Sequence, residues 1–151
     1  MSRAPDELAR VCRQAQLIGG MLVLTVPVFA FVVEMLRTNQ APFLGFSPKA
    51  PLGLLRFVFA TMAVLILVIV NFVRKQIVAG PAAGRAPLPQ RLLTASIVAL
   101  AMCEAIAIYG VVLFLLGGQR GDFYGFAAFA LLGFAVYFPR RSQWEAWAHQ
   151  A

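Results

Sequence analysis

A carboxylate, Glu104, stands in the middle of a long uncharged stretch of the sequence. No Lys, Arg, Asp or Glu occurs in residues 92–103 or 105–119. If this stretch is helical, a rise of 1.5 Å per residue puts Glu104 roughly 18 to 20 Å from either end, which is the depth of a bilayer centre. A charge there costs on the order of 2.5 to 3.5 kcal/mol, and such residues commonly mark function. Glu104 is therefore the first candidate for chemistry.

Glu104 is expected to be uncharged at rest, because a hydrocarbon environment penalises the ionised carboxylate. A neutral carboxyl both donates and accepts hydrogen bonds. Counting residues from the same edge of the bilayer brings Thr61, on another apolar segment, to the depth of Glu104. Thr61 is the first predicted hydrogen-bond partner. Thr25, or the carbonyl that Pro27 frees at Val23, is the second.

Small side chains follow one face of the same helix at steps of three and four residues, and such stripes let helices approach closely in lipid. Glu104 is one position, about 100°, away from this stripe, so we expect it to border the packed seam and not to face lipid. Gly121 and Gly125 form a G-x-x-x-G that is expected to pack against this helix. The stripe consists of Ser96, Ala99, Cys103, Ala107 and Gly110.

The composition predicts an integral membrane protein. Hydrophobic residues make up 61% of the 151 residues and charged residues only 13%, against about 25% in soluble proteins. The formal charge of +7 sits in short clusters beside apolar segments, which indicates membrane topology and excludes a nucleic-acid surface. We find no nucleophile with a base, no phosphate loop and no ligand spacing for a metal, so we expect neither an enzyme nor a bound cofactor.

The apolar segments predict an all-α, four-helix membrane bundle in one domain. The expected spans are residues 15–36, 54–74, 92–117 and 122–138, the last being the shortest. Gly117 and Gly118 can end the third helix and Asp122 can cap the fourth, so these two helices should form an antiparallel hairpin. The remaining segments are expected to be a head (1–14), an external loop (37–53), an internal loop (75–91) and an interfacial tail (139–151).

Positive charges set the expected orientation. With four spans, nine Lys and Arg lie on the side of the termini and four lie on the other side. The positive-inside rule therefore places both termini in the cytoplasm, and we expect residence in a bacterial inner membrane. Cys12 and Cys103 fall at different depths and are not expected to form a disulfide. Glu34 and Arg37 are expected to form an interfacial ion pair.

Residues 99–113 resemble the carboxylate-bearing helix of the rotary ATPase proteolipids, the ring subunits called c. The resemblance is a Glu followed five residues later by Tyr-Gly and an aliphatic run. It implies that Glu104 is an ion-carrying carboxylate with Tyr109 near it. Because Ala105 replaces the hydroxyl residue of sodium-binding versions, the implied ion is a proton. The chain differs from that family in lacking a glycine repeat in residues 54–73.

Two functions follow as hypotheses. In the first, the chain is a structural or accessory subunit of a membrane complex, and Glu104 is a neutral hydrogen-bonding group. In the second, it is a proton-translocating, proteolipid-like subunit in which Glu104 carries the proton and Tyr109 and Thr61 help to bind it. Both hypotheses imply the lipid bilayer and other membrane subunits, or further copies of this chain, as partners.

Overall fold

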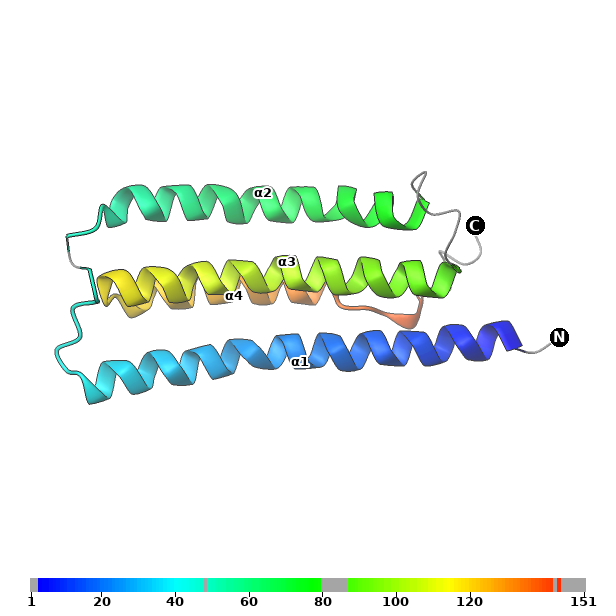
Figure 1. Ribbon diagram of the computed structural model, residues 1–151, viewed down its shortest axis with the longest axis horizontal. Coiled ribbons are helices and arrows are strands. Elements are labelled where there is room, and N and C mark those ends of the chain that lie inside the picture. Colours follow the sequence, from blue (N-terminus) through cyan, green and yellow to red (C-terminus); the bar gives the residue numbers. More distant parts are fainter. Residues whose placement is uncertain (1–2, 48, 80–86, 143, 145–151) are drawn as a thin grey trace.

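The computed structural model describes residues 3–47, 49–79, 87–142 and 144, and it is helical, as predicted. Its four helices follow the predicted spans but extend beyond several of their ends, because polar turns continue the helices past the apolar segments (Figure 1). Residues 80–86 of the expected internal loop lie outside the described residues. The helices are α1 (Arg3–Asn39), α2 (Leu52–Ala79), α3 (Leu88–Gly117) and α4 (Arg120–Tyr137).

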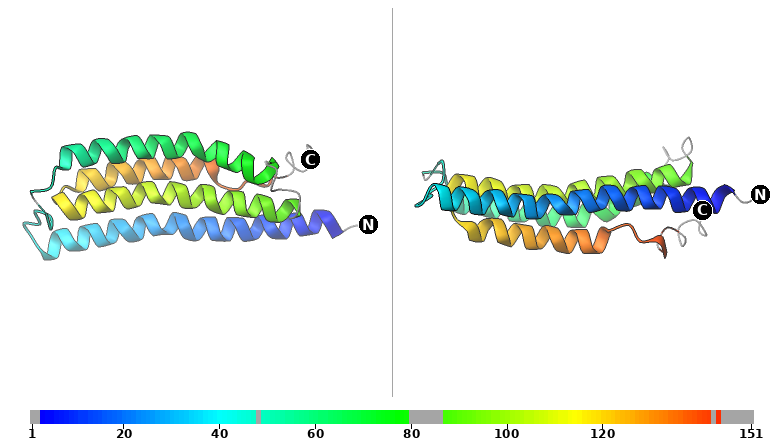
Figure 2. Two further views of the ribbon diagram at one scale, coloured as in Figure 1. Left: turned by 45° about the horizontal axis from the view of Figure 1, so that its top comes forward. Right: turned by 90° about the horizontal axis from the view of Figure 1, so that it is seen from below.

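Helix α3 is the centre of the fold. It contacts all three other helices, whereas α1 and α2 make little contact with each other. The helices α1, α3 and α2 lie side by side as a layer, and α4 packs on one side of this layer (Figures 1 and 2). In the described part of the chain, no helix covers the opposite side of α3. The arrangement is therefore a three-helix layer with one added helix, so α3 keeps one uncovered side.

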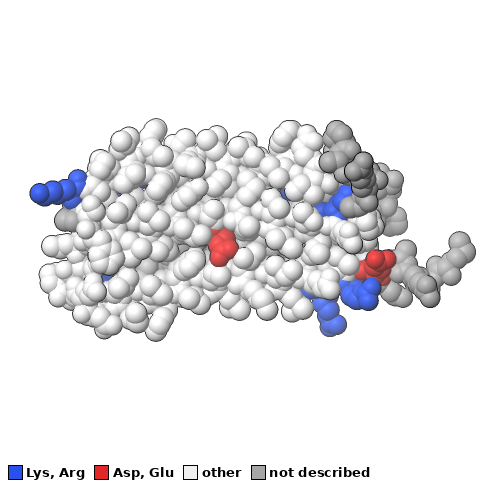
Figure 3. Space-filling view, viewed as in Figure 1, with Lys and Arg blue, Asp and Glu red and all other residues white. Residues whose placement is uncertain are grey.

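Three helices, α1, α2 and α3, are long and apolar enough to cross a membrane. In the most apolar window of α3, 44% of residues are buried, against 17% in α1 and 11% in α2. The outer helices instead expose large apolar side chains such as Phe31, Phe57 and Phe72. On the face in Figure 3, Lys and Arg side chains lie towards the two ends of the molecule. This apolar middle with charged ends is what a membrane-spanning protein requires.

The hairpin between α3 and α4 forms as predicted, with Gly117 and Gly118 at the end of α3. Gly118 adopts a left-handed conformation (φ 70°), and its N–H donates to the Phe114 carbonyl oxygen at 2.7 Å. The prediction that Asp122 caps α4 is wrong. Gln119 occupies the N-cap position, and Asp122 lies inside the first turn, where its carboxylate bonds Arg56 instead.

The segment between α1 and α2 is irregular, as its prolines predict, but it is tied to the end of α3. The backbone N–H groups of Phe46 and Ser47 donate to the carbonyl oxygens of Leu115 and Leu116 at 2.8 and 3.2 Å. These bonds satisfy carbonyls at the helix end that have no partner within the helix. These two bonds therefore attach the α1–α2 connection to the α3–α4 hairpin.

Two separate hydrophobic clusters stabilise the molecule. The larger one contains Cys103 and the α3–α4 contact, and the smaller one, near the start of α1, contains Cys12 and Trp144. Trp144 is 1% exposed, so this part of the tail is buried against α1, α2 and α3. Residues 145–151 of the expected interfacial tail lie outside the described residues.

Candidate functional site at the middle of α3

Glu104 lies on the uncovered side of α3. The exposed residues of this helix within its apolar part are Thr94, Ala101 and Ile108, which recur every seven residues. Glu104 falls between Ala101 and Ile108 at steps of three and four, so it shares their face. Its side chain is half-buried. Figure 3 shows one acidic side chain halfway along the molecule, on the face that α4 does not cover.

This position differs from the one that the small-residue stripe predicts. Cys103, the stripe residue next to Glu104, is fully buried against α4. The rotation of about 100° between neighbouring residues carries Glu104 out of that contact and onto the side that α4 leaves open. The carboxyl group can therefore be reached from outside the fold.

The predicted hydrogen bonds of Glu104 do not form. The Thr61 hydroxyl donates to the carbonyl oxygen of Phe57 in its own helix at 2.9 Å, and the Thr61 side chain is exposed. The Thr25 hydroxyl likewise donates to the carbonyl oxygen of Leu22 at 2.6 Å. Across the described residues, no hydrogen bond or ion pair reaches the Glu104 carboxyl. The group is open to a partner outside this chain.

Tyr109 contributes to the contact between α3 and α2. Its ring stacks on Phe59 with centroids 4.9 Å apart and an angle of 17° between the planes. Stacked aromatic pairs of this kind stabilise helix contacts by about 0.5 to 1.5 kcal/mol beyond area burial. The structure thus gives Tyr109 a packing contact, and it lies five residues from Glu104 along the helix.

The five residues of the small-residue stripe on α3 are all buried, and they bring α4 close. A side chain at Gly110 would meet Phe126 Cβ at 2.8 Å and the Phe123 carbonyl oxygen at 3.0 Å. A side chain at Gly133 of α4 would meet Cys103 Sγ at 2.8 Å. Ser96, the first residue of the predicted stripe, is 1% exposed, and its hydroxyl has no hydrogen-bond partner among the described residues.

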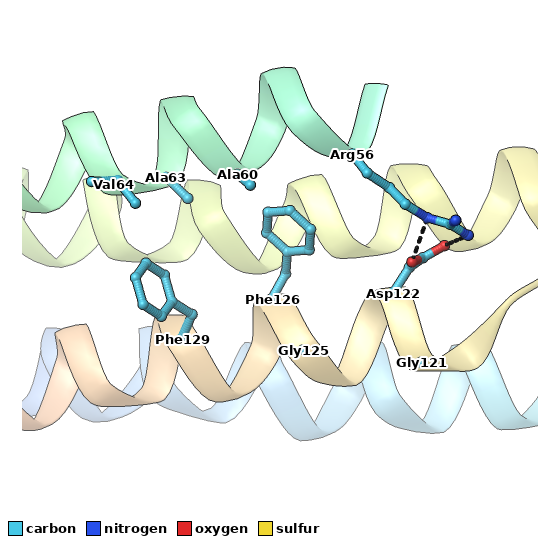
Figure 4. Close-up of a pocket in the computed structure, with 9 residues that line it drawn as sticks. All are labelled: Arg56, Ala60, Ala63, Val64, Gly121, Asp122, Gly125, Phe126 and Phe129. Atoms are coloured by element: carbon cyan, nitrogen blue, oxygen red, sulfur yellow. Dashed lines mark hydrogen bonds and ion pairs between the residues drawn. The ribbon is translucent and has the colours of Figure 1, made fainter. Parts of the chain in front are cut away.

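Gly121 and Gly125 do not pack against α3 as expected. Both are exposed, and a Cβ atom at either position would meet nothing within 4 Å. They line a groove of about 360 Å³ between α2 and α4, whose other walls include Ala60, Ala63 and Phe129 (Figure 4). The contact with α3 uses the opposite side of α4, through Phe123, Ala127 and Ala130.

An ion pair that the sequence analysis did not predict closes one end of this groove. The Arg56 guanidinium donates to both carboxylate oxygens of Asp122 at 2.8 Å and to Gln119 Oε1 at 2.7 Å (Figure 4). Arg56 and Asp122 lie near the starts of α2 and α4, which run in the same direction. Their matching depths, counted from the two helix starts, are the sequence signal that indicates the pair.

A second polar cluster lies at the same end of the molecule. The predicted ion pair is confirmed, with Arg37 Nε 2.8 Å from Glu34 Oε2. The Tyr124 hydroxyl donates to the other carboxylate oxygen of Glu34 at 2.9 Å, which links α1 to α4. All of these side chains are exposed or half-buried, so their contribution to stability is small. Within the described ranges, no three His, Cys, Asp or Glu residues come together as metal ligands.

Comparisons of the chain with protein families, with curated proteins and with solved structures find no match. The resemblance of residues 99–113 to the proteolipid helix therefore stays a prediction, and the function has to be argued from the site itself.

Proposed function

We propose that this chain is a structural or accessory subunit of a membrane complex, in which Glu104 is a neutral group that hydrogen-bonds a neighbouring subunit. One observation carries the proposal: Glu104 is half-buried on the uncovered side of α3 and has no partner among the described residues. A polar group left unsatisfied in hydrocarbon costs several kcal/mol. A neighbouring helix with a polar side chain at the same depth would remove this cost.

The proposal includes four membrane crossings, with both termini in the cytoplasm of a bacterium. Helix α4 has 18 residues, which corresponds to about 27 Å at helical rise, close to the hydrocarbon thickness of about 30 Å. It packs along α3, and the Arg56–Asp122 pair sets its start level with that of α2. These features support α4 as a fourth span.

The proposal can be tested by purifying the tagged chain from its native membrane in a mild detergent and measuring the mass of the assembly. We expect Glu104→Leu to reduce the assembly and Glu104→Gln to retain it, because an amide also donates and accepts hydrogen bonds. Thr61→Leu is the matched control, since it removes a polar group at the corresponding depth of α2 whose hydroxyl bonds only its own helix. Unchanged assembly in Glu104→Leu would refute the proposal.

Proton translocation is the second candidate function, with Glu104 as the carrier. The observation in its favour is that the Glu104 carboxyl group, in the middle of α3, is accessible and is bonded by no described side chain. Thr25 and Thr61, the polar partners predicted on other helices, bond within their own helices, so they offer no further stations for a proton path. A partner subunit would have to supply them.

This second function predicts a different outcome for the conservative variant. Glu104→Gln would assemble normally but would abolish proton flux into vesicles that contain the purified complex. A hydrophobic carbodiimide would label Glu104 in a pH-dependent manner, and Glu104→Gln would not be labelled. Normal flux in Glu104→Gln would exclude a carrier role and leave the structural one.

A further inference from the structure

The uncovered side of α3 has the spacing of a helix–helix seam. Its central residues, Thr94, Ile97, Ala101, Glu104 and Ile108, alternate steps of three and four, which is the a/d pattern of two helices that cross at a small left-handed angle. Thr94, Ala101 and Ile108 are exposed, and Ile97 and Glu104 are half-buried. No described segment of this chain occupies the seam.

The residues of this seam allow a second helix to approach. Ala101 lies one turn before Glu104 and has only a methyl group, and small residues at this position let helix backbones come close in lipid. Figure 2 shows α4 on the other side of the α1–α3–α2 layer, so it does not obstruct this approach. A polar residue at one central position of a largely apolar seam is a known device for setting register and oligomeric state.

We propose that the occupant of this seam is the α3 helix of a second copy of the chain, in a parallel pair whose two Glu104 carboxyl groups hydrogen-bond each other. The inference rests on the proposed structural function and names its partner. Two copies in one membrane have the same orientation, so a two-fold axis between them runs along the membrane normal. Such an axis brings each residue opposite its own counterpart at the same depth.

The chemistry of Glu104 fits this self-pairing. A neutral carboxyl has one donor and one acceptor side, so two of them satisfy each other through a pair of O–H to O=C hydrogen bonds. A lipid chain offers neither donor nor acceptor at the membrane centre. The groove between α2 and α4 also has a polar end, but its Arg56 and Asp122 are already bonded to each other. The seam of α3, in contrast, carries a polar group that still needs a partner.

Disulfide cross-linking in native membrane vesicles tests the pairing. The variants are Ala101→Cys and Ile108→Cys on the seam, with Leu65→Cys, 50% exposed on α2, as the matched control. The two native cysteines are buried, and the chain without an added cysteine gives the background level of cross-linking. On oxidation with copper phenanthroline, we expect a product of twice the 16.4 kDa chain mass from both seam variants and not from the control.

Substitution of Glu104 in the Ala101→Cys and Ile108→Cys variants tests the hydrogen bonds between the two carboxyl groups. Loss of both interhelical bonds in lipid should raise the dissociation constant of the pair by roughly 10- to 1,000-fold in Glu104→Leu, and Glu104→Gln should keep cross-linking near the original level. Ala101→Trp, at an exposed position, should block pairing without unfolding the chain.

The outcomes separate this inference from the proposed function. A cross-link from the seam to a different polypeptide would overturn the second copy as partner and would leave the structural function standing. Seam cysteines that form no product, together with a monomeric mass in mild detergent, would overturn both. Equal cross-linking from the seam and from Leu65→Cys would also overturn the pairing, because random encounters would explain it.

Discussion

Arg56 holds both carboxylate oxygens of Asp122 at 2.8 Å and thereby joins the first turns of α2 and α4. These two helices otherwise make few contacts. The side chain of Asp122 is 14% exposed and that of Arg56 is 37% exposed, so the pair is partly shielded from solvent. This ion pair joins residues 66 positions apart in the chain and anchors the start of α4, next to the hairpin turn.

The first prediction concerns this pair. Asp122→Ala removes the two hydrogen bonds that the Arg56 guanidinium donates to the carboxylate and leaves the one to Gln119. We expect the free energy of unfolding to fall by about 1 kcal/mol, because the partial exposure of Arg56 limits the loss. Unfolding in mixtures of mild detergent and SDS, followed by circular dichroism, gives the measurement. Arg37→Ala, which breaks the more exposed pair with Glu34, is the control and should change little. Equal effects of the two variants would argue against a special role for Arg56 and Asp122.

The second prediction compares two glycines. Gly110→Ala would place a methyl group 2.8 Å from Phe126 Cβ and close to the backbone of Phe123, so α4 must shift. We expect a loss of about 1 to 3 kcal/mol in the same unfolding assay. Gly125→Ala is the matched control, because its methyl group would meet nothing within 4 Å, and it should be neutral or stabilise by up to about 1 kcal/mol. The reverse order of stabilities would contradict the observed α3–α4 packing.

The third prediction concerns Tyr137, which is 5% exposed. Its hydroxyl donates to the carbonyl oxygen of Leu67 at 3.1 Å and so connects the end of α4 to α2. Tyr137→Phe keeps the ring and removes this bond, and we expect a loss of about 0.6 kcal/mol, the average for interhelical bonds in membranes. Tyr124→Phe, which removes an exposed bond to Glu34, serves as the control and should change stability less. A stable Tyr137→Phe variant with unchanged unfolding would show that the bond contributes nothing.

The fourth prediction uses Cys103, which is 0% exposed and packs against Gly133. Because the thiol becomes accessible only when α3 and α4 separate, a maleimide should label it much more slowly in mild detergent than after unfolding in SDS. A Cys12→Ser background assigns the signal to Cys103. Rapid labelling in mild detergent would contradict the close contact between these helices.

Much of the architecture could be predicted from local features of the chain. Apolar length identified four helices, and the glycines at 117 and 118 identified the hairpin between α3 and α4. The i+3 pairing of Glu34 with Arg37 was also predictable. These features depend on neighbours within one or two turns, so they can be read from spacing alone.

The faces of the helices could not be assigned in the same way. Gly121 and Gly125 have the spacing of a packing motif, yet they face a groove, because α4 meets α3 through its other side. Thr61 has the depth of Glu104, yet it faces outward from α2. Depth along a helix follows from counting residues, but rotation about its axis depends on which neighbour buries more apolar surface.

Glu104 illustrates the division between what the sequence determined and what the tertiary structure decided. The sequence by itself determined that a carboxyl group sits at the centre of an apolar helix, because the helical rise converts a residue count into a depth. Only the tertiary structure decided that this group is accessible, because α1, α2 and α4 surround α3 unequally and leave the side of Ala101, Glu104 and Ile108 uncovered. The physical reason is that coverage of a helix face depends on contacts between segments far apart in the chain, which local periodicity does not encode.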